Sequence, residues 1–451
     1  MHVDIIATGS LGDRSYVVHD GRSALVVDPQ RDLDRVRGVL DAAGVRCAAV
    51  AETHIHNDYV TGGHALAECT GADYLVNAAD PVDVDRRPVS DGDTFSVGSM
   101  TVRVVATPGH TDTHLAYVVE DADEPDEPAA VFTGGSLLFG SVGRTDLVDT
   151  ARTRELTASQ YRSARRLADQ LRDDTLVYPT HGFGSFCSSG GASGADASTI
   201  GKERAENDAL LATDEADYVE ALVANLTAYP RYYAHMAPAN LAGPVESDLR
   251  PVDEVDPAEL VGRIGDGEWV VDLHTRTAFA ADHLRGSIGI ELGDQFATYL
   301  GWLIPWGTPV TLVGDDPEAV ANAQRQLTRI GIDRPAGAAH GTPADLVERA
   351  SRSSYPTATF TDLAARDGAE PVLDVRRDDE WARGGIPSAV HVPLADLLDR
   401  LDGLPPGTLW VHCASGFRAS IAASLLDRAG RDVVLVDDGY DRAVQLGLAT
   451  G

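Results

Sequence analysis

Short apolar runs alternate with polar, turn-rich segments through the first half of the chain. Five of these runs are β-rich and end in a cluster of Gly, Pro, Asp or His: residues 23–30, 47–54, 100–110, 129–136 and 175–182. This pattern predicts strands that each lead into a turn. Residues 161–171 have apolar positions at helical spacing. We therefore expect an α/β domain over residues 1–240, with its polar residues gathered just beyond the strand ends.

The second half of the chain contains one pattern twice. Residues 250–345 hold "EWVVDLHTRTAF" and then "TPVTLVGDD", and residues 355–451 hold "EPVLDVRRDDEW" and then "GTLWVHCASG". In both, a strand precedes a helix and a second strand precedes a second helix. This alternation predicts two small α/β domains, each with a parallel sheet covered by helices. A Pro- and Asp-rich stretch over 235–260 predicts a linker before them.

Size and charge narrow the classes of protein. The 451 residues suffice for three domains, and 43% of them are hydrophobic. The formal net charge of −33 argues against nucleic-acid binding, because phosphates would be repelled, and we interpret it as adaptation of a halophilic host to salt. The chain has no visible signal peptide or long apolar run, so we expect a cytoplasmic protein with no membrane partner. The sequence leaves a homo-oligomer open.

Cys413 has the most specific chemical setting. It ends the apolar strand "TLWVHC", and Arg418 stands five residues later at the start of a predicted helix. Backbone N–H groups and the positive end of the helix dipole favour an anion there, and Arg418 adds a fixed charge. A cysteine so placed suits a thiolate or persulfide. A buried cysteine acting as a small apolar residue is the alternative.

This last domain resembles the rhodanese family of sulfurtransferases. The resemblance rests on "LDVRRDDEW", with Asp374, Arg376, Glu380 and Trp381, on "IPSAVHVPL", and on the loop from Cys413 to Arg418. It implies that Cys413 carries sulfane sulfur as a persulfide, with Arg418 beside it. The six-residue loop favours sulfur over the phosphate that related phosphatases bind. Gly385 stands where many members have histidine. In the preceding copy Gly314 takes the place of the cysteine, so we expect an inactive rhodanese-like domain.

The first domain places histidines just beyond its predicted strands. His54, His56, Asp58 and Tyr59 follow one strand, His110 follows another, and His181 follows a third. A lone histidine is more often structural than a ligand. Imidazoles that converge from several strand ends suit a first-row metal.

The series resembles the metallo-β-lactamase fold, and this implies an αββα sandwich followed by the two parallel-sheet domains. In that fold His54, His56 and His110 would hold one metal. Asp58, the residue at 59 and His181 would hold a second, with a bridging aspartate from a T-G-D motif. Tyr59 and Gly135 replace two of those groups. The replacements disfavour a binuclear hydrolase and leave one metal position, for which we name His54, His56 and His110.

The domain order resembles persulfide dioxygenase–rhodanese fusions, and "GRTDL", with Arg144, matches as well. The resemblance implies one iron, with zinc as the alternative, and O₂ and a low-molecular-weight thiol persulfide as substrates. Thiosulfate or sulfite would be a substrate of the rhodanese domain. Because Gly135 replaces the usual aspartate ligand, either His56 supplies a third imidazole or the metal is weak or absent. Asp58, Tyr59, His181 and Arg144 would then surround the metal.

Two other functions stay open at this stage. One is a metal-dependent thioester hydrolase similar to glyoxalase II, which zinc content and cleavage of an acyl-thiol would reveal. The other is a sulfurtransferase whose first domain is a non-catalytic scaffold.

Overall fold

The computed structural model describes residues 1–366, 368 and 370–449. The chain divides into two compact units. The first comprises residues 1–248 together with 328–331, and the second comprises the remaining described residues from 249 onward. No helix in the described ranges is long and apolar enough to cross a membrane.

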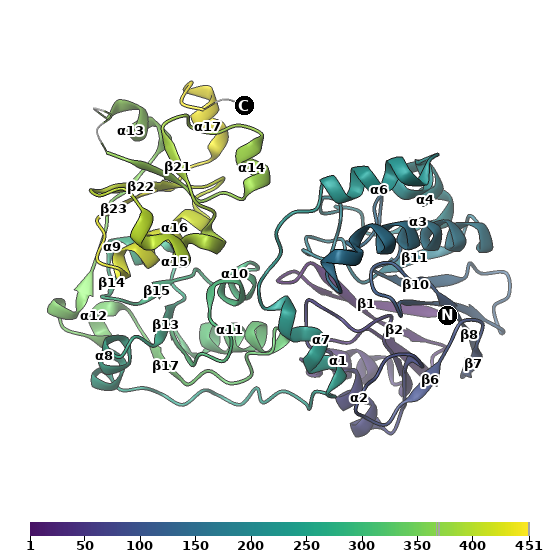
Figure 1. Ribbon diagram of the computed structural model, residues 1–451. Helices are drawn as coiled ribbons and strands as arrows, with labels where there is room; N and C mark the ends of the chain where they lie inside the picture. Colours follow the sequence, from purple (N-terminus) through teal and green to yellow (C-terminus); the bar gives the residue numbers. More distant parts are fainter. Residues whose placement is uncertain (367, 369, 450–451) are drawn as a thin grey trace. The chain divides into compact units, whose positions relative to one another are not determined.

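The first unit is built on two six-stranded sheets (Figure 1). One sheet has the order β1-β2-β3-β4-β5-β6: β1 (His2–Thr8), β2 (Asp13–His19), β3 (Ser23–Val27), β4 (Arg46–Ala51), β5 (Asp73–Asn77) and β6 (Arg87–Val89). The other has the order β12-β11-β10-β9-β8-β7: β7 (Thr94–Val97), β8 (Met100–Ala106), β9 (Leu115–Asp121), β10 (Ala130–Gly134), β11 (Leu176–Pro179) and β12 (Ser198–Thr199).

Helices cover the outer faces of both sheets. They are α1 (Asp34–Ala43), α2 (Gly63–Thr70), the 3₁₀ turn Thr150–Arg152, α3 (Thr153–Gln170), α4 (Ile200–Glu206), α5 (Asp208–Leu211), α6 (Glu215–Ala224) and α7 (Tyr233–Leu241). The sequence predicted only residues 161–171 of α3, and α7 occupies the start of the stretch predicted as linker, despite Pro238 inside it.

Three apolar clusters show that this unit is a four-layer sandwich. The first joins side chains of both sheets, among them Tyr16, Leu25 and Phe132, and so fills the space between them. The second packs α1 and α2 against the β1–β6 sheet, and the third packs α3 and α6 against the other sheet. Burying each large apolar side chain contributes about 1.5–3 kcal/mol. The predicted αββα sandwich is confirmed.

The second unit contains two parallel sheets. The first has the order β15-β13-β16-β17: β13 (Trp269–Asp272), β15 (Ile288–Gly289), β16 (Val310–Gly314) and β17 (Gly337–His340). The second has the order β19-β23-β22-β20-β21: β19 (Thr357–Ala358), β20 (Val372–Asp374), β21 (Ala389–His391), β22 (Leu409–His412) and β23 (Val433–Val436). A short antiparallel pair, β14 (His283–Leu284) and β18 (Arg352–Ser353), lies beside them.

Short helices connect these strands, as the repeated pattern predicted. The first sheet has α8 (Pro257–Gly265), α9 (Arg276–Ala281), α10 (Phe296–Leu303), α11 (Pro317–Arg329) and α12 (Pro343–Leu346). The second has α13 (Phe360–Ala365), α14 (Asp378–Ala382), α15 (Leu397–Arg400), α16 (Phe417–Arg428) and α17 (Tyr440–Gln445). The 3₁₀ turns are Arg349–Ser351, Leu394–Asp396 and Leu401–Gly403. The two parallel-sheet folds are confirmed, while the limits 250–345 and 355–451 stay predictions.

Candidate metal centre and cysteine loop

Three loops at strand ends bring four histidines of the first unit together. The loop after β4 carries His54 and His56, the loop after β8 carries His110, and His181 follows β11. The loop after β10 carries Gly135, where the β10–β11 register shifts and Gly134 has a φ of 52°. All four histidine side chains are buried.

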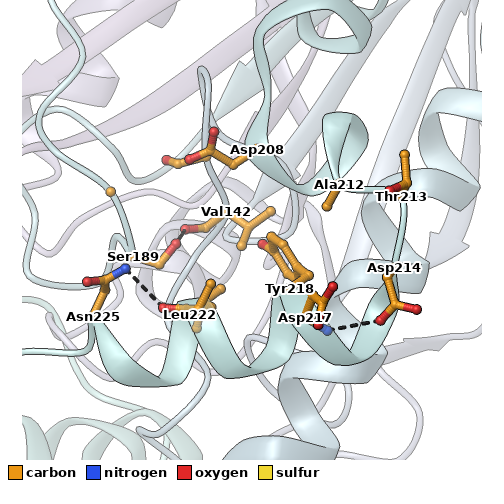
Figure 2. Close-up of a pocket in the computed structure, with 13 residues that line it drawn as sticks. Val142, Ser189, Asp208, Ala212, Thr213, Asp214, Asp217, Tyr218, Leu222 and Asn225 are labelled. Carbon is orange, nitrogen blue, oxygen red and sulfur yellow. Dashed lines mark hydrogen bonds between the residues drawn. The ribbon is translucent and has the colours of Figure 1, made fainter.

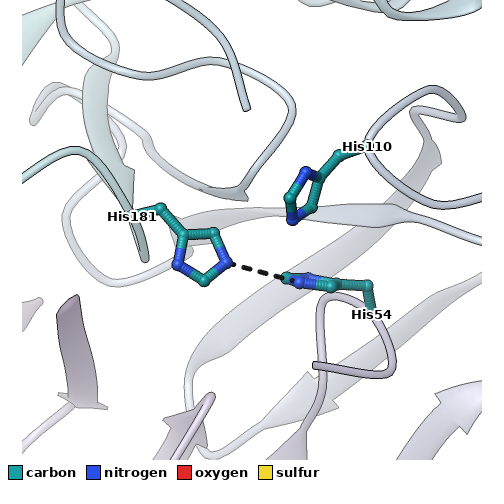
Figure 3. Close-up of side chains that lie close together, drawn as sticks. All are labelled: His54, His110 and His181. Carbon is teal, nitrogen blue, oxygen red and sulfur yellow. Dashed lines mark hydrogen bonds between the residues drawn. The ribbon is translucent and has the colours of Figure 1, made fainter. Parts of the chain in front are cut away.

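His54, His110 and His181 form a cluster whose ring nitrogens face one another (Figure 3). Their potential ligand atoms all lie within 4.8 Å, and the Nε2 atoms of His54 and His181 are 3.4 Å apart. Nε2 of His110 is buried and has no hydrogen-bond partner. Converging imidazole nitrogens of this kind are what a first-row metal requires.

The outer nitrogens of these rings explain why the inner ones are free to bind. Nδ1 of His110 donates to the carbonyl of Arg144 at 2.7 Å, and Nδ1 of His181 donates to Asp13 at 2.9 Å. Nδ1 of His54 lies 2.9 Å from the Thr53 hydroxyl, which itself donates to Asp28 and therefore accepts from the ring. Nε2 of His54 and of His110 is then left with a lone pair, as in metal-bound histidines, and Nε2 of His181 gains one when that ring gives up its second proton. The residues present fit a metal ion.

The electrostatics favour the same reading. Burial and the neighbouring imidazoles lower the pKa of His54 well below its usual value and that of His110 to about 3, so both rings stay neutral. Burial and the charge of Asp58 raise the pKa of Asp13 to about 8. Although burial disfavours its charge, Asp58 and Asp13 raise the pKa of His181 well above its usual value. The cluster therefore has carboxylates directly behind one ligand.

His56 lies next to this cluster but its ring is held elsewhere. Its Nε2 is 3.0 Å from the Tyr59 hydroxyl, 3.2 Å from Glu52 and 3.3 Å from Asp28. Burial opposes the charge, but the two carboxylates raise the pKa of His56 to about 9. Its ligand atoms group with Asp58 and His181, or with Asp28 and Glu52, rather than with His54 and His110. The set predicted from sequence stays a prediction, and the distances favour His181 as the third imidazole.

Tyr59 belongs to the His56 network. It is fully buried, its ring stacks on His56 with centroids 4.3 Å apart, and its hydroxyl also reaches the Asp28 carbonyl at 3.3 Å. Asp28 has a φ of 51°, and its carboxylate accepts from the Thr53 amide and the Thr53 and Thr180 hydroxyls. A strained backbone held by this many bonds is typical of functional sites.

The sequence reasoning missed the three carboxylates Asp13, Asp28 and Glu52. Each is fully or almost fully buried. Glu52 directly precedes the T-H-x-H segment and Asp28 ends a strand, so their positions carried a signal; Asp13 carried none.

Arg144 acts on the cluster through its backbone. Its side chain is buried, pairs with both oxygens of Asp146 at 2.7 Å and donates to the carbonyls of Phe186 and Thr227. Because its own carbonyl accepts from His110, this anchoring fixes the orientation of that ring.

Gly135 leaves space that the His110 ring uses. A Cβ at Gly135 would lie 2.4 Å from Cδ2 of His110, and the Gly135 N–H donates to Nε2 of His114 at 3.0 Å. An aspartate at this position would therefore need the His110 ring to shift away from its present hydrogen bond.

We expect the Gly135→Ala substitution to destabilise the protein by about 1–3 kcal/mol, the usual cost of overpacking a tight site, and to lower its metal content. Denaturant unfolding and elemental analysis measure both. The control is Gly38→Ala in α1, where a Cβ meets nothing within 4 Å and stability should rise slightly. A Gly135→Ala protein with unchanged stability and more metal would contradict the steric account.

The cysteine loop of the second unit lies between β22 and α16. Cys413 directly follows β22 and is buried, and Arg418 is in the first turn of α16. Gly416 has a φ of 90°, and a Cβ there would overlap the Asp437 carboxylate. The loop needs glycine at this position for both reasons.

Arg418 is fixed by two contacts with Glu380, at 2.5 and 2.8 Å. Burial opposes ionisation of Glu380, yet Arg418 lowers the pKa of that carboxyl.

Gly385, where histidine was expected, faces the Trp381 ring: a Cβ there would lie 2.2 Å from it. In the preceding copy Gly314 ends β16, and the sequence has no cysteine between residues 188 and 412. The tyrosine ring of Tyr299, from α10, packs against Phe417 of the cysteine loop at 5.5 Å.

The cleft of about 370 Å³ in Figure 2 contains none of the predicted site residues. It lies along α6 and is lined by Asp208, Asp214, Asp217 and Tyr218 among others.

Comparisons with known proteins support the description of the first unit and of the domain that carries the cysteine loop. Residues 359–445 match the rhodanese-like domain family. The chain is 24% identical to a metallo-β-lactamase structure from Staphylococcus aureus, with a TM-score of 0.67, covering 75% of this chain and 99% of that one. The first unit therefore has the metallo-β-lactamase fold.

Two of the relatives each match part of the chain. The mitochondrial persulfide dioxygenase of Homo sapiens is 27% identical over 234 residues, which are 51% of this chain and 81% of that protein. The hydroxyacylglutathione hydrolase of Synechococcus sp. is 32% identical over 165 residues, 36% of this chain. The match spans 60% of that hydrolase, less than two thirds of its length. The chain thus joins a metallo-β-lactamase-fold domain with persulfide dioxygenase relatives to a rhodanese-like domain, as the sequence predicted.

Proposed function

We propose that this protein is an enzyme of sulfur metabolism that oxidises a low-molecular-weight thiol persulfide at the His54–His110–His181 cluster and transfers sulfane sulfur at Cys413. The observation that carries the proposal is the convergence of three imidazole nitrogens in a chain that also holds a rhodanese-like cysteine loop. The persulfide dioxygenase relative and the rhodanese-like family both concern sulfane sulfur.

The reaction at the first site would be R–S–SH + O₂ + H₂O → R–SH + H₂SO₃. The terminal sulfur is oxidised from the sulfane to the sulfite level and O₂ is reduced. An iron ion, held by His54, His110 and His181, would supply binding of the persulfide sulfur and of O₂. Asp13 and Asp58 keep the His181 ring oriented with Nε2 inward, and the Arg144 carbonyl does the same for His110.

At the second site Cys413 would act as nucleophile. Its thiolate attacks the outer sulfur of thiosulfate, the S–S bond breaks, sulfite leaves, and a Cys413 persulfide remains. The first-turn N–H groups of α16 and the fixed charge of Arg418 stabilise both the Cys413 thiolate and the Cys413 persulfide anion. Attack by cyanide or a thiolate on the outer sulfur then restores the cysteine. In the reverse direction, sulfite from the first site would take sulfur from Cys413 as thiosulfate.

A thioester hydrolase is the second candidate, because hydroxyacylglutathione hydrolases are among the relatives and His56, Asp58 and His181 form an adjoining group. Against it, Gly135 offers no bridging carboxylate and Tyr59 holds His56 away.

Oxygen consumption tests the proposal against both alternatives. Full-length protein loaded with iron should take up one O₂ per persulfide and release one sulfite. Zinc-loaded protein should take up none and should not cleave an acyl-thiol ester. A protein that retains no iron and consumes no O₂ would refute the dioxygenase half, and acyl-thiol cleavage by the zinc form would establish the hydrolase.

A further inference from the structure

A second cleft, of about 520 Å³, lies beside the loops that carry the histidine cluster. Ile55, Asn57 and Thr111 line it, and they are sequence neighbours of His54, His56 and His110. Val148, which is 46% exposed, and Tyr233 contribute apolar surface. The volume is within the range of small-molecule sites, and a molecule in the cleft contacts both histidine-bearing loops.

Asp80 is a buried acidic residue of this cleft. The residue is only 5% exposed, one carboxylate oxygen accepts from the Thr113 hydroxyl at 2.5 Å, and the other has no hydrogen-bond partner. No lysine, arginine or histidine in the described part of the chain forms an ion pair with it. The nearby Arg86 directs its guanidinium to the main-chain carbonyls of Ala78, Asp80 and Val82 instead.

A buried carboxylate oxygen without a partner costs about 1–3 kcal/mol or more, so such groups normally have a hydrogen-bond partner from the protein, from water or from a ligand. Burial accordingly raises the pKa of Asp80 to about 6. The hydroxyl of Thr111, also buried in the cleft wall, lacks a partner as well.

The charges of the cleft decide which ligand chemistry fits. Asp80 and Asp112 are its charged lining residues, and Asp112 is already paired with Arg152 at 2.8 Å. No lysine or arginine is among the described residues that line the cleft. A phosphate or carboxylate would meet no cation there, whereas an ammonium group would be attracted to the Asp80 carboxylate.

We infer that this cleft binds the organic part of the persulfide substrate and that Asp80 receives its ammonium group, so that the preferred carrier is a small amino-thiol. The Thr111 hydroxyl offers a second hydrogen bond to the same molecule. This inference rests on the proposed function for the identity of the reacting group, while the ammonium site itself can be tested without turnover.

The test compares two persulfides that differ in one group, those of cysteamine and of 2-mercaptoethanol. Asp80→Asn keeps the size of the side chain and the Thr113 contact. It should raise the KM for cysteamine persulfide about 10- to 100-fold, the worth of a charge-assisted hydrogen bond, with kcat unchanged. The KM for the 2-mercaptoethanol compound should not change. Asp73→Asn is the matched control and should change neither, because that carboxylate does not line the cleft and is paired with Arg87 on the exposed surface.

Calorimetric binding of cysteamine and 2-mercaptoethanol themselves separates this inference from the proposed function. Wild-type protein should bind cysteamine more tightly, and Asp80→Asn should abolish the difference; thermal unfolding verifies that the variant is folded. Equal cysteamine binding by the two proteins overturns the inference, even if O₂ uptake is normal. Discrimination by Asp80 without O₂ uptake supports the ammonium site and overturns the dioxygenase proposal instead.

Discussion

Replacing Cys413 by serine is expected to reduce thiosulfate:cyanide sulfurtransferase activity to the background rate. A hydroxyl at this position cannot form the persulfide, because an alcohol is not appreciably ionised near neutral pH and offers no stable bond to sulfane sulfur. Cys413 is buried and serine is close to cysteine in size, so stability should change little. Thiocyanate formation measures the activity.

The metal cluster of the first unit provides the internal control for this substitution. Metal content and O₂ uptake per persulfide should be equal in Cys413→Ser and in the wild type, since Cys413 is not among the ligand groups. Cys69→Ser is the matched cysteine control, because Cys69 is exposed and far from the loop in sequence; it should leave thiocyanate formation intact. Sulfurtransferase activity that survives in Cys413→Ser would refute the assignment of the nucleophile.

The rhodanese-like half was predictable because its chemistry is local in the sequence. The strand, the loop from Cys413 to Arg418 and the helix follow one another directly, so the pattern of one segment defines the site. Its one long-range part, Glu380, also lay in a recognisable segment. What the sequence did not indicate was the fit of Gly385 beneath Trp381 and the ring of Tyr299 that packs on Phe417.

The histidine cluster was predictable as a site but not as a set of ligands. Strand-end positions placed His54, His56, His110 and His181 near one another. Which three nitrogens converge depends on side-chain partners: Asp13 and Asp28 come from distant segments, and Glu52 lies four residues before His56. Spacing in H-x-H cannot show that Glu52 and Asp28 turn the His56 ring, because the Asp28 contact spans 28 residues of chain. Gly135 looked like a lost ligand, and the structure gives it a steric reason.

Removing His181 is expected to abolish metal binding, and this decides between the two ligand sets. In His181→Ala the cluster retains only His54 and His110, so metal affinity should fall by more than about 100-fold, the upper end of what loss of an outer partner costs. Elemental analysis after dialysis, and titration with Fe²⁺ or Zn²⁺ under anaerobic conditions, measure the affinity. Circular dichroism verifies the fold, because Asp13 and Asp58 lose their imidazole partner.

His56 should behave differently, because its ring compensates two buried carboxylates. His56→Ala leaves Asp28 and Glu52 without their cation, and we expect a loss of about 3–5 kcal/mol in the free energy of unfolding. Tyr59→Phe is the milder variant of the same network: it removes only the hydroxyl that reaches His56, and metal affinity should stay at the wild-type level. If Tyr59→Phe and a folded His56→Ala protein lost the metal while His181→Ala kept it, the ligand set would be His54, His56 and His110. We expect the opposite: His181→Ala loses the metal, while Tyr59→Phe and a folded His56→Ala protein keep it. That result would mean that His56 and Tyr59 stabilise the loop and that His181 binds the metal.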